Sequence, residues 1–105
     1  MTTRQRKSAA VRTLEKMAGG PLTFARLIRS TREAEEWSQT TMARRLGISV
    51  SHLCDIEHGR KAVSAGRAAA WAHELGYPDW VWVRLALQDE LDRAGLDLRV
   101  AVEAA

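Results

Sequence analysis

Residues 43–59 read ARRLGISVSHLCDIEHG, and this stretch decides the fold that the sequence predicts. Gly47 interrupts an otherwise helical pattern, and glycine adopts a positive φ at little cost. Ser49 follows as a candidate N-cap, because a serine hydroxyl accepts the free amides of a helix's first turn. Leu53 and Ile56 then recur at the spacing of one inward helix face. We therefore expect a helix ending at Leu46, a tight glycine turn, and a second helix running to about His58.

The outer face of that second helix carries short polar side chains. With Leu53 and Ile56 inward, Ser51, His52 and Asp55 point mostly outward. A helix that enters the major groove of DNA, about 12 Å wide, needs small or hydrogen-bonding side chains on its outer face. Two short helices joined in this way form the helix-turn-helix pattern.

Helical periodicity places the first helix of this pair over residues 39–46 and predicts further helices over residues 8–18, 23–36, 64–75 and 79–94. Their expected N-caps include Ser38, Ser64 and Asp79. Residues 96–102 instead alternate apolar with polar or small residues, which is typical of a short β-strand. The sequence thus predicts an all-α fold of five to six helices with a short C-terminal strand.

The charge is unevenly distributed. Residues 1–32 hold eight Lys/Arg and one acidic residue, whereas residues 33–105 hold eight Lys/Arg and twelve acidic residues. This pattern fits one face for a polyanion and another for a different partner, and it fits equally a solvated surface with uneven charge. No apolar run approaches the length needed to span a membrane, and the basic N-terminus lacks the apolar core of a secretory signal. With Cys54 as the single cysteine, we expect a cytoplasmic protein that does not bind membranes.

The segments FARLIRSTRE, WSQTTMARRLGIS, LCDIEHGR and AAAWAHELGY, spread over residues 24–77, together resemble the Cro/C1-type (XRE) helix-turn-helix family. The resemblance implies a lambda-repressor-like domain that binds double-stranded operator DNA as a dimer. It also implies a structural ion pair between Arg32 and Glu57, and a phosphate contact from Gln39.

The family positions that touch base edges fall on Val50, Ser51, His52 and Asp55. Val50 suits a thymine methyl group, and Asp55 either accepts from cytosine N4 or pairs with Arg44 or Arg60 without touching a base. Contacts to phosphates fix the register of a protein on DNA without reading sequence. The residues expected to make them are Gln39, Arg44, Ser49, His58, Arg60 and Lys61.

The sequence gives less support to metal binding, catalysis or small-molecule binding. Cys54 and His58 lie one helical turn apart, but ligands on one exposed helix make a poor zinc site, so no metal or other cofactor is expected. Ser51, His52 and Asp55 share one outward face and cannot converge on a substrate, so an enzyme is not expected. Nothing indicates a small-molecule ligand.

The C-terminal part is apolar on two sides of its helix, which favours a partner beyond its own core. The residues expected to form a homodimer interface are Trp82, Leu85, Leu96, Leu98 and Val100. The alternative is that residues 1–20 fold back over this surface.

These patterns divide the chain into a basic arm with a short helix (1–20), a DNA-binding domain (21–77) and a dimerisation segment (78–105). The function expected is that of a sequence-specific transcriptional regulator, most simply a dimeric repressor that binds a palindromic operator through residues 49–58. An antitoxin that neutralises a toxin protein and represses its own operon is the alternative, because residues 74–103 hold seven acidic and three basic residues.

Overall fold

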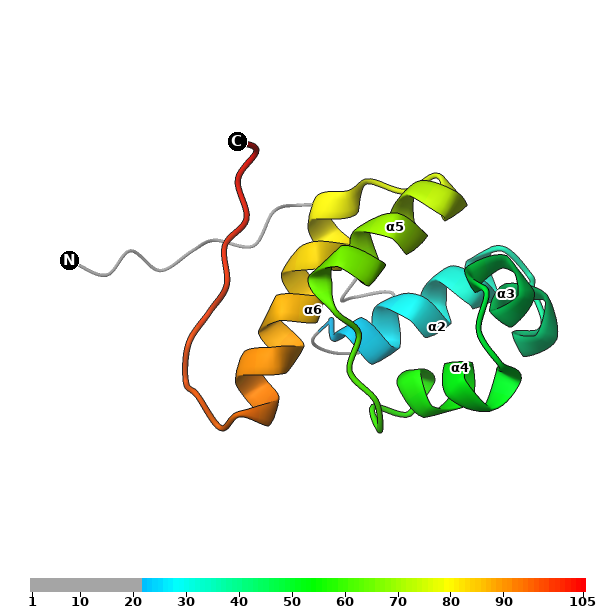
Figure 1. Cartoon of the computed structure of the whole chain (residues 1–105), viewed down its shortest axis with the longest axis horizontal. Coiled ribbons are helices and arrows are strands. Elements are labelled where there is room, and N and C mark those ends of the chain that lie inside the picture. The colour runs from blue at the N-terminus through cyan, green and yellow to red at the C-terminus, as the bar shows by residue number, and fades with distance from the viewer. Residues whose placement is uncertain (1–21) are drawn as a thin grey trace.

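Hydroxyl side chains start four of the helices in the computed structural model, which describes residues 22–105 (Figure 1). Thr23 caps α2 (Phe24–Ala34), Ser38 caps α3 (Gln39–Leu46), Ser49 caps α4 (Val50–Glu57) and Ser64 caps α5 (Ala65–Leu75). Each hydroxyl oxygen accepts the backbone N–H three residues later, which satisfies one free amide of the first turn. The caps predicted at Ser38, Ser49 and Ser64 are confirmed. The helix expected over residues 8–18 lies outside the described residues.

Helix α6 (Asp79–Arg93) starts differently from the prediction. Its N-cap is Pro78, which makes no side-chain cap hydrogen bond, so the prediction that Asp79 caps this helix is wrong. The ring of Pro78 already holds φ at −61°, which suits the entry into a helix. The Asp79 carboxylate lies 3.0 Å from His73 Nε2 instead, and its charge remains favourable in the first turn of α6.

The core lies where α2, α5 and α6 meet and extends to the pair α3 and α4. Trp82 of α6 is 1% exposed and packs edge-on against Phe24 of α2, with ring centroids 5.9 Å apart. Leu53 and Ile56 of α4 are buried in the same core, at 0% and 1% exposure. Figure 1 shows α3 and α4 together at one end of the molecule and α6 at the other. Helix α6 therefore shares one core with the other helices. The predicted division of roles between residues 21–77 and residues 78–105 stays a prediction.

Burial on α6 separates its two apolar faces. Trp82 and Leu85, predicted to face a second chain, are 1% and 2% exposed and pack inside their own chain. The other face carries Trp80, which is 39% exposed. The half-buried apolar residues of this outer face of α6 are Val83, Leu87 and Leu91.

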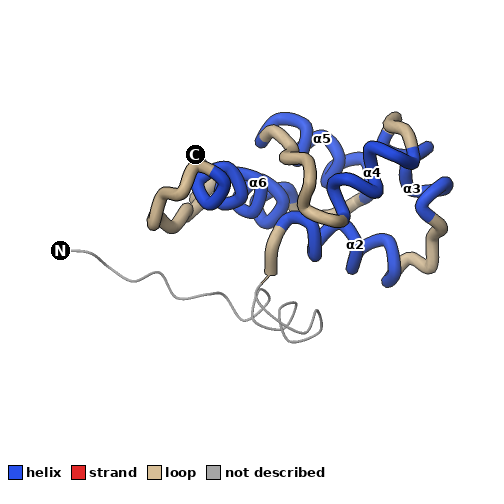
Figure 2. The backbone as a smooth tube through the Cα atoms, turned by 90° about the horizontal axis from the view of Figure 1, so that it is seen from below, coloured by secondary structure: helices blue, strands red, loops and turns tan. Residues whose placement is uncertain are grey.

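The predicted strand over residues 96–102 is not seen, and Figure 2 shows only helices and loops among the described residues. The segment leaves α6 through Gly95, whose φ is +73°, and turns back along that helix (Figure 1). A strand needs a neighbouring strand for its backbone hydrogen bonds, and residues 22–105 of one chain provide none. The prediction of a strand over residues 96–102 is therefore wrong for the described residues, because an alternating pattern cannot supply the neighbouring strand that pairing needs.

Candidate nucleic-acid interface

A left-handed glycine joins α3 to α4, as predicted. Gly47 has φ 70° and ψ 31°, and its N–H bonds to the carbonyls at the end of α3. The N–H of Ile48 donates to Ala43 O at 3.0 Å, so the turn closes on itself. Ser49 then accepts from His52 N at 3.0 Å and starts α4 at once. The C-cap Gly47 and the N-cap Ser49 thus fix the angle between the two helices.

The outer face of α4 is open to solvent. Val50 is 41% exposed and Ser51 is exposed, while His52, Cys54 and Asp55 are half-buried. All four residues predicted to read bases therefore reach the surface of the same helix. Their contact with bases is not tested by this geometry and stays a prediction.

Asp55 is already paired. Arg60 Nε lies 2.9 Å from Asp55 Oδ1, and the amides of Arg60 and Lys61 donate to Asp55 O at 2.8 and 3.3 Å. Of the alternatives that the sequence left open, the structure contains the ion pair with Arg60. The hydrogen bond to Asp55 raises the pKa of the Arg60 guanidinium above its ordinary value. Asp55 therefore holds the start of the loop after α4 against the helix end.

The residues predicted to contact phosphates surround α4. Ser49, Arg44, His58, Arg60 and Lys61 are exposed, and Gln39 is half-buried. Arg44 lies near the end of α3, whereas His58, Arg60 and Lys61 follow α4 directly. The Gln39 side chain donates to Glu57 Oε1 at 3.2 Å. Exposed cationic side chains thus precede and follow α4 along the chain.

A buried ion pair supports α4 from behind. Arg32 Nε and Nη2 donate to the two carboxylate oxygens of Glu57 at 2.7 and 3.0 Å, as the family resemblance implied. The side chains of Arg32 and Glu57 are 18% and 2% exposed, respectively. Arg32 Nη1 also donates to Trp37 O at 3.2 Å. The hydrogen bond to Glu57 raises the pKa of Arg32. Because the pair joins α2 to the last residue of α4, it fixes the helix that faces solvent.

Cys54 of α4 and His58, which caps the end of α4, lie close together without forming a recognisable metal centre. Cys54 Sγ is 3.5 Å from His58 Nδ1, but the same nitrogen is 2.8 Å from Cys54 O. Arg60 Nη2 lies 3.7 Å from the sulfur. Within residues 22–105 no third His, Cys, Asp or Glu side chain completes a group that could hold a metal.

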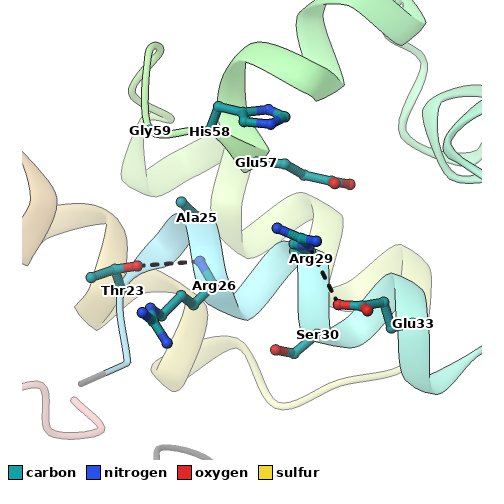
Figure 3. Close-up of a pocket in the computed structure, with 9 residues that line it drawn as sticks. All are labelled: Thr23, Ala25, Arg26, Arg29, Ser30, Glu33, Glu57, His58 and Gly59. Carbon is teal, nitrogen blue, oxygen red and sulfur yellow. Dashed lines mark hydrogen bonds and ion pairs between the residues drawn. The ribbon is translucent and has the colours of Figure 1, made fainter. Parts of the chain in front are cut away.

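Sequence reasoning did not single out the cations of α2. An open hollow of about 410 Å³ lies between one side of α2 and the end of α4; Figure 3 shows the residues that line it. Arg26 and Arg29 lie on its α2 side, and His58 lies on its α4 side. Arg29 pairs with Glu33 at 3.5 Å (Figure 3). Arg26 and Arg29 are three residues apart, which places them on one side of a helix. This spacing was the sequence signal that could have identified them.

Arg93 is a further residue that sequence reasoning missed. Its Nη2 donates to Gly59 O at 2.7 Å, and its Nε donates to Asp89 Oδ2 at 2.7 Å. This contact spans 34 positions of the sequence and connects the end of α6 to the loop after α4. No local pattern distinguishes Arg93 from an ordinary solvated arginine.

Helix α6 has neither the length nor the apolar composition that crossing a bilayer requires, and the same holds for every other described helix. The family model of the helix-turn-helix domain matches residues 23–79, which run from the cap of α2 to the first residue of α6. No curated protein and no solved structure matches the chain.

Proposed function

The chain belongs to the helix-turn-helix domain family, and we propose on this premise that it is a transcriptional regulator that binds specific DNA sequences through α4. The observation that carries the proposal is the outer face of α4, which exposes Val50 and Ser51 beside a loop of cationic residues. A face of small side chains fits a major groove, and flanking cations meet the phosphates on its two edges.

The base-reading role falls first on Ser51 and His52, which carry hydrogen-bonding groups at the centre of the exposed face. Val50 offers a methyl surface to thymine. Asp55 contributes by fixing Arg60, since the two side chains are paired at 2.9 Å. A charged residue held in one orientation loses less side-chain entropy when it binds a phosphate.

The phosphate-contacting role falls on six residues around α4, namely Gln39, Arg44, Ser49, His58, Arg60 and Lys61. Each phosphate neutralised by a cation releases counterions, so affinity falls steeply as salt rises. We further propose that two copies bind a palindromic operator, since a two-fold pair of recognition helices matches two half-sites one helical turn apart. Repression by blocking polymerase is the simplest outcome of such binding.

Selection of bound duplexes from a random DNA pool tests the proposal directly. It reports binding, palindromy and half-site spacing in one measurement. An enriched sequence with two inverted half-sites is the expected result. Recovery of no enriched sequence at low salt contradicts sequence-specific binding.

Variants at the two classes of site test the residue roles. Lys61→Ala is expected to weaken binding on every sequence and to reduce the salt slope by about 1. Ser51→Ala and His52→Ala are expected to change sequence preference instead. Arg67→Ala is the matched control, because it removes the same charge from α5, where Arg67 lies over Trp71. The assigned roles are wrong if both classes change affinity and preference alike.

An antitoxin function is the second candidate, because α6 and the segment after it hold most of the acidic residues of the C-terminal half. These elements lie at the opposite end of the molecule from α3 and α4 (Figure 1). They would present an acidic surface to a basic toxin while α4 faces DNA. Co-purification of a small basic protein encoded beside this gene would support this function, and a gene with no such neighbour contradicts it.

A further inference from the structure

The side chain of Gln88 holds the segment after α6 in a specific orientation. Its Nε2 donates to Leu98 O at 2.8 Å, and Val100 N donates to its Oε1 at 2.9 Å. One carboxamide therefore satisfies the carbonyl of one residue and the amide two residues later. A single residue of a neighbouring parallel strand makes the same pair of bonds. The Gln88 side chain thus makes the two hydrogen bonds that one residue of a neighbouring strand would make.

This arrangement leaves the opposite edge of the segment without partners. In an extended backbone, the N–H and C=O groups of successive residues point to alternate sides. Leu98 O and Val100 N both bond to Gln88 of α6, so in an extended segment the groups of Asp97 and Arg99 point away from that helix. Among residues 22–105, no hydrogen bond involves the backbone or the side chain of Asp97 or Arg99. An unpaired extended edge is a template for adding a strand.

We propose that residues 96–100 pair with the same residues of a second copy of this chain, as two antiparallel strands centred on Leu98. In this register Asp97 of each copy lies opposite Arg99 of the other, so two pairs of opposite charges form. The outward backbone groups of Asp97 and Arg99 then exchange four hydrogen bonds across the two-fold axis. The segment LDLRV is therefore self-complementary in charge and in hydrogen bonding, as a two-fold interface requires.

Exposed apolar side chains support this choice of occupant. Leu96 and Leu98 are 48% and 57% exposed, and the two-fold register places Leu98 against its own copy and Leu96 against Val100. Two short strands alone are marginally stable in water. The outer face of α6 defined above is a further exposed apolar surface on the helix that holds the tail, and it includes Trp80 at 39% exposure. The pairing itself does not depend on the proposed function. Its role on DNA does rest on that function, because there the pairing brings the α4 helices of two copies into one dimer.

Charge reversal tests the register on the full chain. Sedimentation equilibrium gives the dissociation constant of the dimer for the unaltered chain, Asp97→Arg and Arg99→Asp. Each single change places like charges opposite each other in both pairs, so we expect at least about tenfold weaker association. The double variant D97R/R99D restores opposite charges and is expected to restore association. Arg67→Asp on α5 is the matched control and leaves association unchanged.

Mixing provides a second measurement that does not depend on the stability of any one variant. Asp97→Arg and Arg99→Asp are each expected to remain monomeric, whereas their equimolar mixture forms a heterodimer. Circular dichroism confirms that each variant keeps its helices. The inference is overturned if the unaltered chain is monomeric at 100 µM. It is also overturned if Arg99→Asp associates as tightly as the unaltered chain, or if neither the double variant nor the mixture associates.

Binding to a duplex with a single half-site separates this inference from the proposed function. Monomeric Arg99→Asp that still binds one half-site supports both. A chain that pairs through its tail but retains no DNA overturns the regulatory function and leaves the pairing in place.

Discussion

The ion pair behind α4 gives the sharpest prediction about stability. Arg32→Met removes both guanidinium hydrogen bonds to Glu57, whose side chain is 2% exposed, and leaves that carboxylate buried without a counter-charge. Removing one partner of a buried ion pair costs about 3–5 kcal/mol. Arg32 keeps 18% exposure and Gln39 still donates to Glu57, so we expect the low end, a loss of about 3 kcal/mol. For a domain of this size the melting temperature then falls by roughly 12–24 °C.

Urea unfolding followed by circular dichroism at 222 nm measures this loss. Arg29→Met is the matched control on the same helix, because the Arg29–Glu33 pair is 57% and 60% exposed and is worth about 0–1 kcal/mol. A double variant with methionine at both Arg32 and Glu57 is expected to recover part of the loss, since it leaves no unpaired buried charge. Equal losses for Arg32→Met and Arg29→Met would refute the reasoning from burial.

Two further predictions concern the backbone and one ionisable pair. Gly66→Ala is expected to raise the free energy of unfolding by up to about 1 kcal/mol, since Gly66 lies inside α5 with no atom within 4 Å of an added Cβ. Gly47→Ala is expected to lower it by about 1–2 kcal/mol, because φ is +70° there; urea unfolding measures both, and changes of the same sign contradict the argument. The hydrogen bond from Tyr77 to Glu35 raises the pKa of Tyr77 to about 12, so the folded state favours the protonated phenol and the free energy of unfolding falls as pH rises from about 10 to about 12. Absorbance at 295 nm follows this sole tyrosine, and its pKa is expected to move back toward 10 in Glu35→Gln, whereas an unchanged titration contradicts the assignment.

Features set by local chemistry were predictable from the sequence. Ser38, Ser49 and Ser64 are caps because a hydroxyl reaches only the amides of its own first turn. Gly47 takes a positive φ because the turn requires one and glycine adopts it without strain. The same local rules predicted that Leu53 and Ile56 point inward, and both are buried. The all-helical fold and the two helices of the motif followed from these positions.

Features set by distant contacts were not predictable in the same way. Asp79 has the side chain of a cap, but the preceding Pro78 already sets the backbone at that position. Gln88 carries no signal of its role, because its bonds to Leu98 and Val100 depend on how the chain turns after α6. Trp82 was assigned to a surface because α6 is apolar on two sides, and only the packing of α2 decides which side is covered.

The hydrogen bond between Arg93 and Gly59 has a consequence for assembly on DNA. It joins the helix that precedes the tail to the loop that holds Arg60 and Lys61, so the proposed pairing and phosphate-binding regions share one structural connection. Linkage is reciprocal, so pairing that strengthens operator binding by some factor must itself be strengthened by the operator by the same factor. Under the proposed function and the proposed pairing, the operator acts as an effector as well as a target, and a monomeric chain would assemble where the DNA sequence allows it.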